Sequence, residues 1–245
     1  MKVFAHRGYS GKYPENTMLA FAKAEEAGCD GIELDVQLTK DGTVVIIHDE
    51  LVDRTTNGQG PVCGYTYDEL AKLDAGKAFG GRYGFCPIPT LEEYLKWAAK
   101  TGLVTNVEIK SGVYYYEGLE EKTAALVRKY HMEDRVIYSS FNHLSLIRIR
   151  EIEPEAVLGA LEGRGEFGNA AAYCRQFGFA AYHPGAAGLK RQTIEDCHEK
   201  GIAVHGWTVN DMGTLERLRE WGCDGIFTNY PGICQAWLKS GQERA

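Results

Sequence analysis

Eight short runs rich in Val and Ile recur along this chain, separated by stretches with the helical spacing of apolar residues. Short apolar runs bounded by turn residues are typical of buried strands. They are Val3–Ala5, Gly31–Val36, Val104–Ile109, Arg135–Ser139, Ala156–Leu161, Phe179–Tyr182, Ile202–Val204 and Gly225–Thr228. Eight strands that alternate with eight helices predict an α/β fold. They favour a closed (β/α)8 barrel of parallel strands over the alternative, an open doubly wound sheet.

Turn and cap residues mark where the predicted helices begin and end. The first helix is expected to follow an Asn16 cap, and a later one to follow Asn210-Asp211. Glycine stands where helices return to strands, and the five residues Gly28–Ile32 recur unchanged as Gly222–Ile226. An ancestral repeat and a general preference of such loops explain this recurrence equally well.

The chain is long enough for one such barrel and too short for two full-sized domains. Its 245 residues, 44% of them hydrophobic, are close to the roughly 250 that one (β/α)8 barrel uses. One connection is unusually long. About forty residues separate the extension of the second strand, which reaches His48-Asp49, from the helix expected over Leu91–Lys100. We therefore expect a single domain over residues 1–245, with an insertion subdomain at about residues 50–89.

Charge, cysteine content and hydropathy indicate which kinds of partner and which cellular compartment to expect. Lys and Arg total 27 against 34 Asp and Glu, giving a net charge of −7, and there is no basic tract to neutralise a nucleic acid. No apolar run reaches the roughly 18 residues of a membrane span, and no signal-peptide pattern precedes the first strand. Seven cysteines without a C-x-x-C pair indicate free thiols. We expect a cytoplasmic protein with no nucleic-acid partner and no membrane insertion.

Polar residues gather at the predicted carboxyl ends of the strands, where (β/α)8 barrels carry their reacting groups. Glu33 and Asp35 stand two residues apart on the second strand, so both project into the barrel. Glu108 and Lys110 do the same on the third strand. Three converging carboxylates are costly in a low-dielectric barrel mouth unless they are protonated, paired or neutralised by a cation. Oxygen ligands alone predict one hard divalent ion, Mg²⁺ or Ca²⁺, at these three acids.

Basic and titratable groups surround this predicted metal site. Arg7 and Lys110 beside a cation give surplus positive charge, which suits a phosphate anion. His6 and His48 titrate near neutral pH. If they stand on opposite sides of the phosphorus, one can activate the attacking oxygen while the other protonates the leaving alcohol. This set of residues is typical of metal-assisted phosphodiester cleavage.

Each of these residues also fits a structural role when it is taken singly. Strand-end carboxylates often cap helices or form salt bridges, and the two basic residues could simply neutralise the acids. Phe141 and Trp207 follow two further strands, where they either fill the barrel or form an apolar wall of the site. The functional interpretation depends on the residues acting as a set.

Ten short motifs follow one another over almost the whole chain. They are His6-Arg7-Gly8, Pro14-Glu15-Asn16-Thr17, Glu33-Leu34-Asp35-Val36, Asp41-Gly42, His48-Asp49, Arg54-Thr55-Thr56-Asn57-Gly58, Pro89-Thr90-Leu91, Glu108-Ile109-Lys110, Trp207-Thr208-Val209-Asn210 and Gly225-Ile226-Phe227-Thr228-Asn229-Tyr230-Pro231. Any one of them is weak evidence. In this order and spacing, the chain resembles the glycerophosphodiester phosphodiesterase family in its bacterial cytoplasmic type.

The resemblance implies a TIM barrel with a small insertion after strand 2. It also implies an enzyme of lipid and glycerol metabolism that hydrolyses a glycerophosphodiester to sn-glycerol 3-phosphate and an alcohol. The site residues that it implies are the metal ligands Glu33, Asp35 and Glu108, the acid–base pair His6 and His48, the phosphate-binding Arg7 and Lys110, and Phe141 and Trp207 beside the glycerol. It favours His6 as the acid, although the sequence leaves the two histidines interchangeable.

Two rival functions compete with this interpretation. A barrel lipase acting on intact lipids would present an exposed apolar or basic membrane surface, of which the acidic chain shows little sign. A non-catalytic phosphodiester sensor could lose a histidine or a metal carboxylate, and this sequence has lost neither. The expected partner is a small-molecule glycerophosphodiester. The sequence leaves open the preferred alcohol and whether the chain forms a homodimer.

Overall fold

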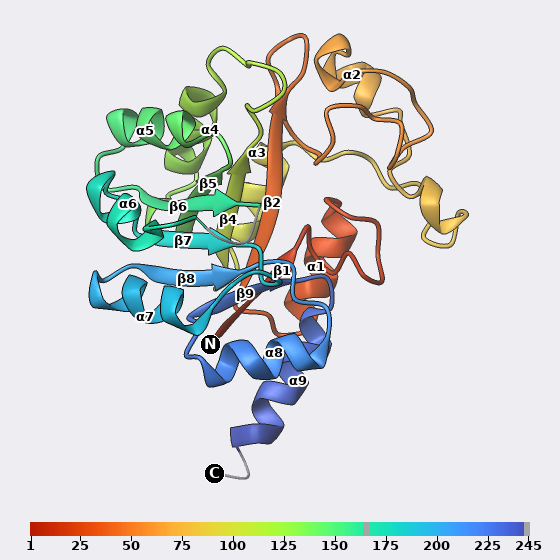
Figure 1. Ribbon diagram of the computed structural model, residues 1–245. Helices are drawn as coiled ribbons and strands as arrows, with labels where there is room; N and C mark the ends of the chain where they lie inside the picture. The colour runs from red at the N-terminus through yellow and green to blue at the C-terminus, as the bar shows by residue number, and fades with distance from the viewer. Residues whose placement is uncertain (164–166, 243–245) are drawn as a thin grey trace.

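Eight parallel strands close into a barrel in the computed structural model, which describes residues 1–163 and 167–242 (Figure 1). They are β1 (Lys2–His6), β2 (Gly31–Leu38), β4 (Val104–Ile109), β5 (Val136–Ser140), β6 (Val157–Glu162), β7 (Ala181–Pro184), β8 (Ala203–Gly206) and β9 (Gly225–Thr228). The barrel closes because β1 pairs in parallel with both β2 and β9. The predicted (β/α)8 TIM barrel is confirmed, and the open doubly wound sheet is excluded.

Helices cover the outside of the barrel (Figure 1). In the described part of the chain, eight of them follow barrel strands: α1 (Met18–Glu26), α3 (Leu91–Ala98), α4 (Leu119–Lys129), α5 (His143–Ile152), α6 (Ala170–Gln176), α7 (Arg191–Glu199), α8 (Met212–Glu220) and α9 (Pro231–Gln242). Among residues 1–163 and 167–242, every helix is too short or too polar to traverse a bilayer.

The cap of helix α1 differs from the prediction by one residue. Thr17 caps the helix, because its hydroxyl accepts a hydrogen bond from the Ala20 N–H at 3.2 Å. Asn16 lies outside the helix with a φ of 55°, and its amide donates to the buried carboxylate of Asp35 at 2.8 Å. The predicted Asn16 cap is wrong because a long-range hydrogen bond takes the side chain that the cap rule assigned to the helix. The other predicted cap, Asp211, is confirmed.

Aromatic rings fill the barrel interior. Phe4, His183, His205 and Phe227 come from four different strands, and the centroids of neighbouring rings lie 4.9–6.2 Å apart. The adjacent strand β6 makes room for them with a glycine. A Cβ atom at Gly159 would lie only 2.3 Å from the His183 ring. Large rings and a missing side chain therefore fit together, as close packing of an interior requires.

The long connection between β2 and α3 carries a separate apolar cluster. It starts with β3 (Val44–Ile46), which pairs antiparallel with β2 and which the sequence did not predict. It also contains α2 (Tyr67–Leu70) and lies to one side of the barrel in Figure 1. The buried side chains of this cluster are Val45, Ile47, Val52, Val62, Leu70, Ala75 and Ile88. We keep the name insertion for residues 50–89; their status as a subdomain of a single domain stays a prediction.

Two buried histidines give the barrel interior a stability that depends on pH. His205 Nδ1 lies 3.0 Å from His183 Nε2, and both side chains are buried. Burial lowers the pKa of His205 to about 4 and that of His183 well below its usual value. An unfolded histidine takes up a proton near pH 6.5. The free energy of unfolding is therefore fully retained above pH 6.5 and falls as the pH drops from 6.5 toward 4.

We predict that lowering the pH from 7.5 to 5 destabilises the protein through this pair, by on the order of 2 kcal/mol for His205. Thermal melts of the wild type and of His205→Gln at both pH values measure the effect. Glutamine takes up no proton, so the variant should lose less Tm between pH 7.5 and 5. Equal losses in the two proteins would show that other groups cause the acid sensitivity.

Candidate active site

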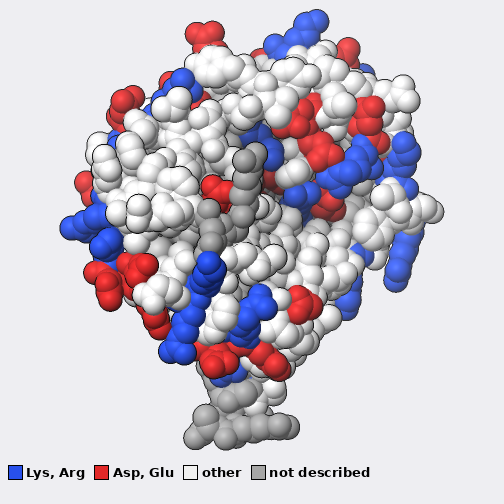
Figure 2. Space-filling model, viewed as in Figure 1, with Lys and Arg blue, Asp and Glu red and all other residues white. Residues whose placement is uncertain are grey.

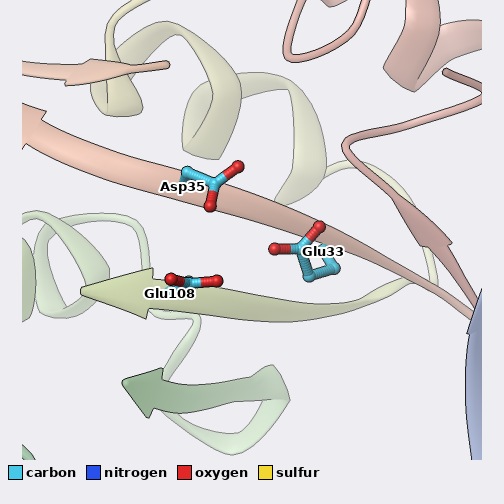
Figure 3. Close-up of side chains that lie close together, drawn as sticks. All are labelled: Glu33, Asp35 and Glu108. Atoms are coloured by element: carbon cyan, nitrogen blue, oxygen red, sulfur yellow. The ribbon is translucent and has the colours of Figure 1, made fainter. Parts of the chain in front are cut away.

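Three carboxylates meet between two neighbouring strands (Figure 3). Glu33 and Asp35 come from β2 and Glu108 from β4, and the strand register places Asp35 beside Glu108. One oxygen atom of each lies within 4.8 Å of those of the other two. All three residues are buried, with exposures of 4%, 0% and 7%. The acids converge as their spacing predicted, and this cluster could bind a metal ion.

Burial makes the negative charge of these acids costly, because it removes the water that would stabilise the charge. Burial raises the pKa of Glu33 and of Glu108, and neighbouring carboxylates raise both pKa values further. Burial also acts to raise the pKa of Asp35, but the charge of Arg7 and other nearby groups outweigh it and hold that pKa at about 2. Asp35 Oδ1 is buried without a hydrogen bond from any described residue, and Lys110 Nζ lies 4.0 Å from it. Converging oxygens, one of which accepts no hydrogen bond, fit a hard divalent cation.

Arg7 and Lys110 place positive charge against the carboxylates. Lys110 Nζ lies 3.0 Å from Glu108 Oε1. Arg7 Nε lies 3.6 Å from Asp35 Oδ2, and the Arg7 backbone N–H donates to Glu33 Oε2 at 2.8 Å. Arg7 Nε is buried without a hydrogen-bond partner among the described residues, and it faces the Asp35 carboxylate. The charge of the guanidinium is therefore held against the acid cluster.

The turn after β1 requires glycine next to Arg7. Arg7 itself has a φ of 55°, and Gly8 follows with a φ of 76°. A Cβ atom at Gly8 would lie 2.7 Å from the carbonyl carbon of Ala20 in helix α1. Glycine permits both the backbone conformation and the close approach of the helix. The motif that begins with His6 is thus fixed by the packing of β1 against α1.

His6 and His48 reach the same cavity but have different partners. His6 Nδ1 lies 2.7 Å from Asn229 Oδ1. Burial together with the charge of Arg7 lowers the pKa of His6 to about 4, so the near-neutral titration that the sequence predicted for this histidine is wrong. His48 Nδ1 lies 2.6 Å from a carboxylate oxygen of Asp49. In each histidine an oxygen acceptor holds the proton on Nδ1, so Nε2 is the atom that can exchange a proton with a substrate.

Aromatic side chains form the opposite wall of this cavity. The ring centroids of Phe141 and Trp207 lie 5.5 Å apart with their planes at 81°. Trp207 Nε1 donates to the carbonyl oxygen of His183 at 2.9 Å, which fixes the indole. Leu161 and Phe227 complete the wall of a cavity of about 320 Å³. A cavity that is charged on one side and apolar on the other suits a small ligand with both characters.

The structure brings the predicted site residues together. Eight of the nine line the cavity: His6, Arg7, Glu33, His48, Glu108, Lys110, Phe141 and Trp207. The ninth, Asp35, is fully buried beside Arg7. Their proximity is a property of the fold, whereas the role of each residue stays a prediction.

Asn106 also lines the cavity, and sequence reasoning missed it. It stands two residues before Glu108 on β4, so the alternation of side chains along that strand could have found it. Its Nδ2 donates to Ser139 Oγ at 2.8 Å, while its Oδ1 has no hydrogen-bond partner among the described residues. The amide adds a neutral polar group next to the three acids.

Comparison with known proteins agrees with this geometry. Residues 6–233 match the sequence model of the Glycerophosphoryl diester phosphodiesterase family. A glycerophosphodiester phosphodiesterase of Caldanaerobacter subterraneus subsp. tengcongensis is 44% identical over 231 residues, which cover 94% of each chain. A solved phosphodiesterase of Oleispira antarctica, in complex with the product sn-glycerol-3-phosphate, is 31% identical with a TM-score of 0.87. That alignment covers 98% of this chain and 97% of the other. The chain therefore belongs to the glycerophosphoryl diester phosphodiesterase family.

Proposed function

We propose that this chain uses a divalent cation and two histidines to hydrolyse glycerophosphodiesters to sn-glycerol 3-phosphate and an alcohol. Membership of the family makes the chain a glycerophosphodiester phosphodiesterase. The observation that carries the proposal is one cavity in which acids, cationic groups and histidines face an aromatic wall. The product bound to the Oleispira phosphodiesterase is the one that we assign to this chain.

Glu33, Asp35 and Glu108 would hold the cation. Their oxygens converge, and Asp35 Oδ1, which accepts no hydrogen bond from a described residue, supports a cation at this place. A bound divalent cation would supply positive charge that stabilises the phosphoryl oxygens in the transition state. Arg7 keeps Asp35 ionised, so this carboxylate is ready to act as a ligand. Oxygen donors of this kind suit Mg²⁺ and Ca²⁺ alike.

Arg7 and Lys110 would bind and orient the phosphate. Their side chains are only 17% and 12% exposed, so their charges act in a poorly hydrated environment. Lys110 Nζ lies 3.3 Å from His48 Nε2. A phosphate oxygen that draws the ammonium toward itself would leave that nitrogen free for proton transfer. Charge-assisted hydrogen bonds from both cations then neutralise an anion whose charge is spread over several oxygens.

The partners of the two histidines support distinct roles. His48 has the carboxylate of Asp49 as its partner, which suits the acid that protonates the leaving alcohol. His6 has the neutral amide of Asn229 as its partner, which suits the base that takes a proton from the attacking water. This assignment is the reverse of the one that the family resemblance favoured.

One observation favours a second candidate, the cleavage of phosphodiesters in intact lipids. Three apolar side chains, Val113, Tyr115 and Leu144, are 71%, 65% and 62% exposed. They lie on the segments that follow β4 and β5, two strands that border the cavity. Exposed apolar side chains on segments beside a site can contact a lipid. Parallel assays with glycerophosphocholine and with dispersed lysophosphatidylcholine separate the two candidates.

We expect a chelator to abolish activity and Mg²⁺ or Ca²⁺ to restore it, because the buried acids need a cation to act together. Glu108→Gln keeps the shape of the side chain but should lose nearly all turnover. Glu151→Gln, an exposed change on helix α5, is the control. Release of glycerol 3-phosphate from glycerophosphocholine gives the activity. Added cation should raise the Tm of the wild type more than that of Glu108→Gln. Undiminished turnover in excess EDTA would contradict the metal assignment.

The two histidines should respond differently to the leaving group. An alkoxide leaves poorly without a proton, whereas an aryl oxide leaves unaided. Replacing the acid should therefore cost about 10²–10⁴-fold in kcat/KM on an alkyl diester and much less on an aryl diester. We expect His48→Ala to be rescued by the aryl substrate and His6→Ala to be impaired on both. Rescue of His6→Ala would exchange the roles, and rescue of neither would argue against an acid–base pair.

Trp207 should contribute to recognition of the glycerol moiety, because its indole lies in the apolar wall of the cavity. Trp207→Ala should lower kcat/KM for glycerophosphocholine far more than for a diester that lacks glycerol. Trp221→Ala, a change at the end of helix α8, should leave the ratio of the two values unchanged. Equal losses on both substrates would show that Trp207 only packs.

A further inference from the structure

Arg54 does not line the cavity, yet its guanidinium joins two carboxylates that lie beside it. Arg54 Nη1 and Nη2 each donate to Glu15 at 2.8 Å. Arg54 Nε and Nη2 donate to Asp49 at 2.5 and 3.0 Å. Bidentate pairs of this kind fix the orientation of a carboxylate as well as its distance. We call these three residues the Arg54 bridge.

Each carboxylate of the bridge also holds a residue of the cavity. Glu15 Oε1 accepts a hydrogen bond from Arg7 Nη1 at 2.9 Å. Asp49 Oδ1 is the partner of His48 Nδ1 at 2.6 Å. Both oxygens are also acceptors of Arg54 Nη2. The position of one guanidinium therefore determines where two groups of the cavity, on different segments of the chain, can lie.

The insertion presents Arg54 from a fixed base. Val52 and Thr56 flank Arg54 and are fully buried, and Val52 belongs to the apolar cluster of the insertion. Thr56 Oγ1 donates to the carbonyl oxygen of Val52 at 2.7 Å, which closes the turn that carries Arg54. The Arg54 side chain itself is 48% exposed. Acidic and basic side chains intermingle on this face of the molecule in Figure 2, on the side next to the insertion.

We propose that Arg54 is a positioning residue for the reaction, and that the insertion takes part in catalysis through it. The proposal rests on the proposed function, which gives Arg7 and His48 their roles. Without Arg54, Glu15 and Asp49 lose the cation that they share. Glu15 then competes with the phosphate for Arg7, and Asp49 no longer has one fixed orientation toward His48. Phosphate binding and proton transfer weaken together, although every group that lines the cavity is still present.

Steady-state kinetics of Arg54 variants on glycerophosphocholine at saturating cation test the proposal. We expect Arg54→Ala to lower kcat and to raise KM, each by about 10-fold or more, because small displacements of reacting groups are costly. Arg54→Lys should recover little, since lysine lacks the planar fork. The matched control is Arg128→Ala, which removes an arginine that is 45% exposed and paired with Glu153. This control should behave as the wild type.

Chemical rescue distinguishes positioning from a general effect on folding. Because Arg54 is half exposed, guanidinium ion at millimolar concentration should restore part of the activity of Arg54→Ala. Sodium chloride at equal ionic strength should restore none. Equal effects of the two salts, or full activity of Arg54→Lys, would overturn the proposal. If Arg54→Ala does not fold, Glu15→Gln and Asp49→Asn each break one half of the bridge and take its place. Glu15→Gln should then chiefly raise KM, and Asp49→Asn should chiefly lower kcat.

A double-mutant cycle tests whether Arg54 acts through the cavity residues. The loss in kcat caused by Arg54→Ala should shrink in a His48→Ala background, because the group that it positions is absent. Calorimetry measures the binding of sn-glycerol 3-phosphate without turnover. Arg54→Ala should weaken this binding in the wild-type background. The same substitution should weaken it much less in an Arg7→Ala background. If the wild type is active and the losses are additive in both cycles, the proposed positioning role of Arg54 is overturned. An inactive wild type would instead overturn the proposed function.

Discussion

The burial of three carboxylates side by side is the constraint on which the rest of this structure depends. Strand alternation forces Glu33 and Asp35 into the barrel from β2, and the parallel register brings Glu108 against them from β4. Water screens these buried acids poorly, so cations and donors must come from the protein or from a ligand. Arg7, Lys110 and the amide of Asn16 supply part of this compensation. The part that is missing is what makes the cluster receptive to a metal ion.

The fold could be predicted from the sequence because strands buried on both faces appear as continuous apolar runs. The same rule could not find β3, which is three residues long and pairs antiparallel beside the barrel. It also could not foresee that Thr17 would cap helix α1, because the amide of Asn16 donates to Asp35 on the neighbouring strand β2. Local propensity failed where the acid cluster required a donor. The cytoplasmic location stays an expectation from the sequence.

The site could be predicted as far as strand geometry determines it. Side chains two residues apart on a strand share a face, and the ends of parallel strands meet, so the nine predicted residues could be assembled before any coordinates. Spacing rules say nothing about an irregular insertion, and Arg54 reaches Glu15 across 39 positions of the chain. Glu15 and Arg54 each belong to a motif that is visible in the sequence. Their hydrogen bonds depend on how the insertion folds back, which no periodicity encodes.

The closure of the barrel also determines when the site can be completed during synthesis of the chain. Of the barrel strands, β1 leaves the ribosome first and β9 last, yet the two are direct neighbours. His6 meets Asn229, its partner 223 residues away, only after nearly the whole chain has been made. At about 5–20 residues per second, translation separates the two by roughly 10–50 s. Until then the first strand has an unpaired edge, and His6 lacks the partner that holds a proton on its Nδ1.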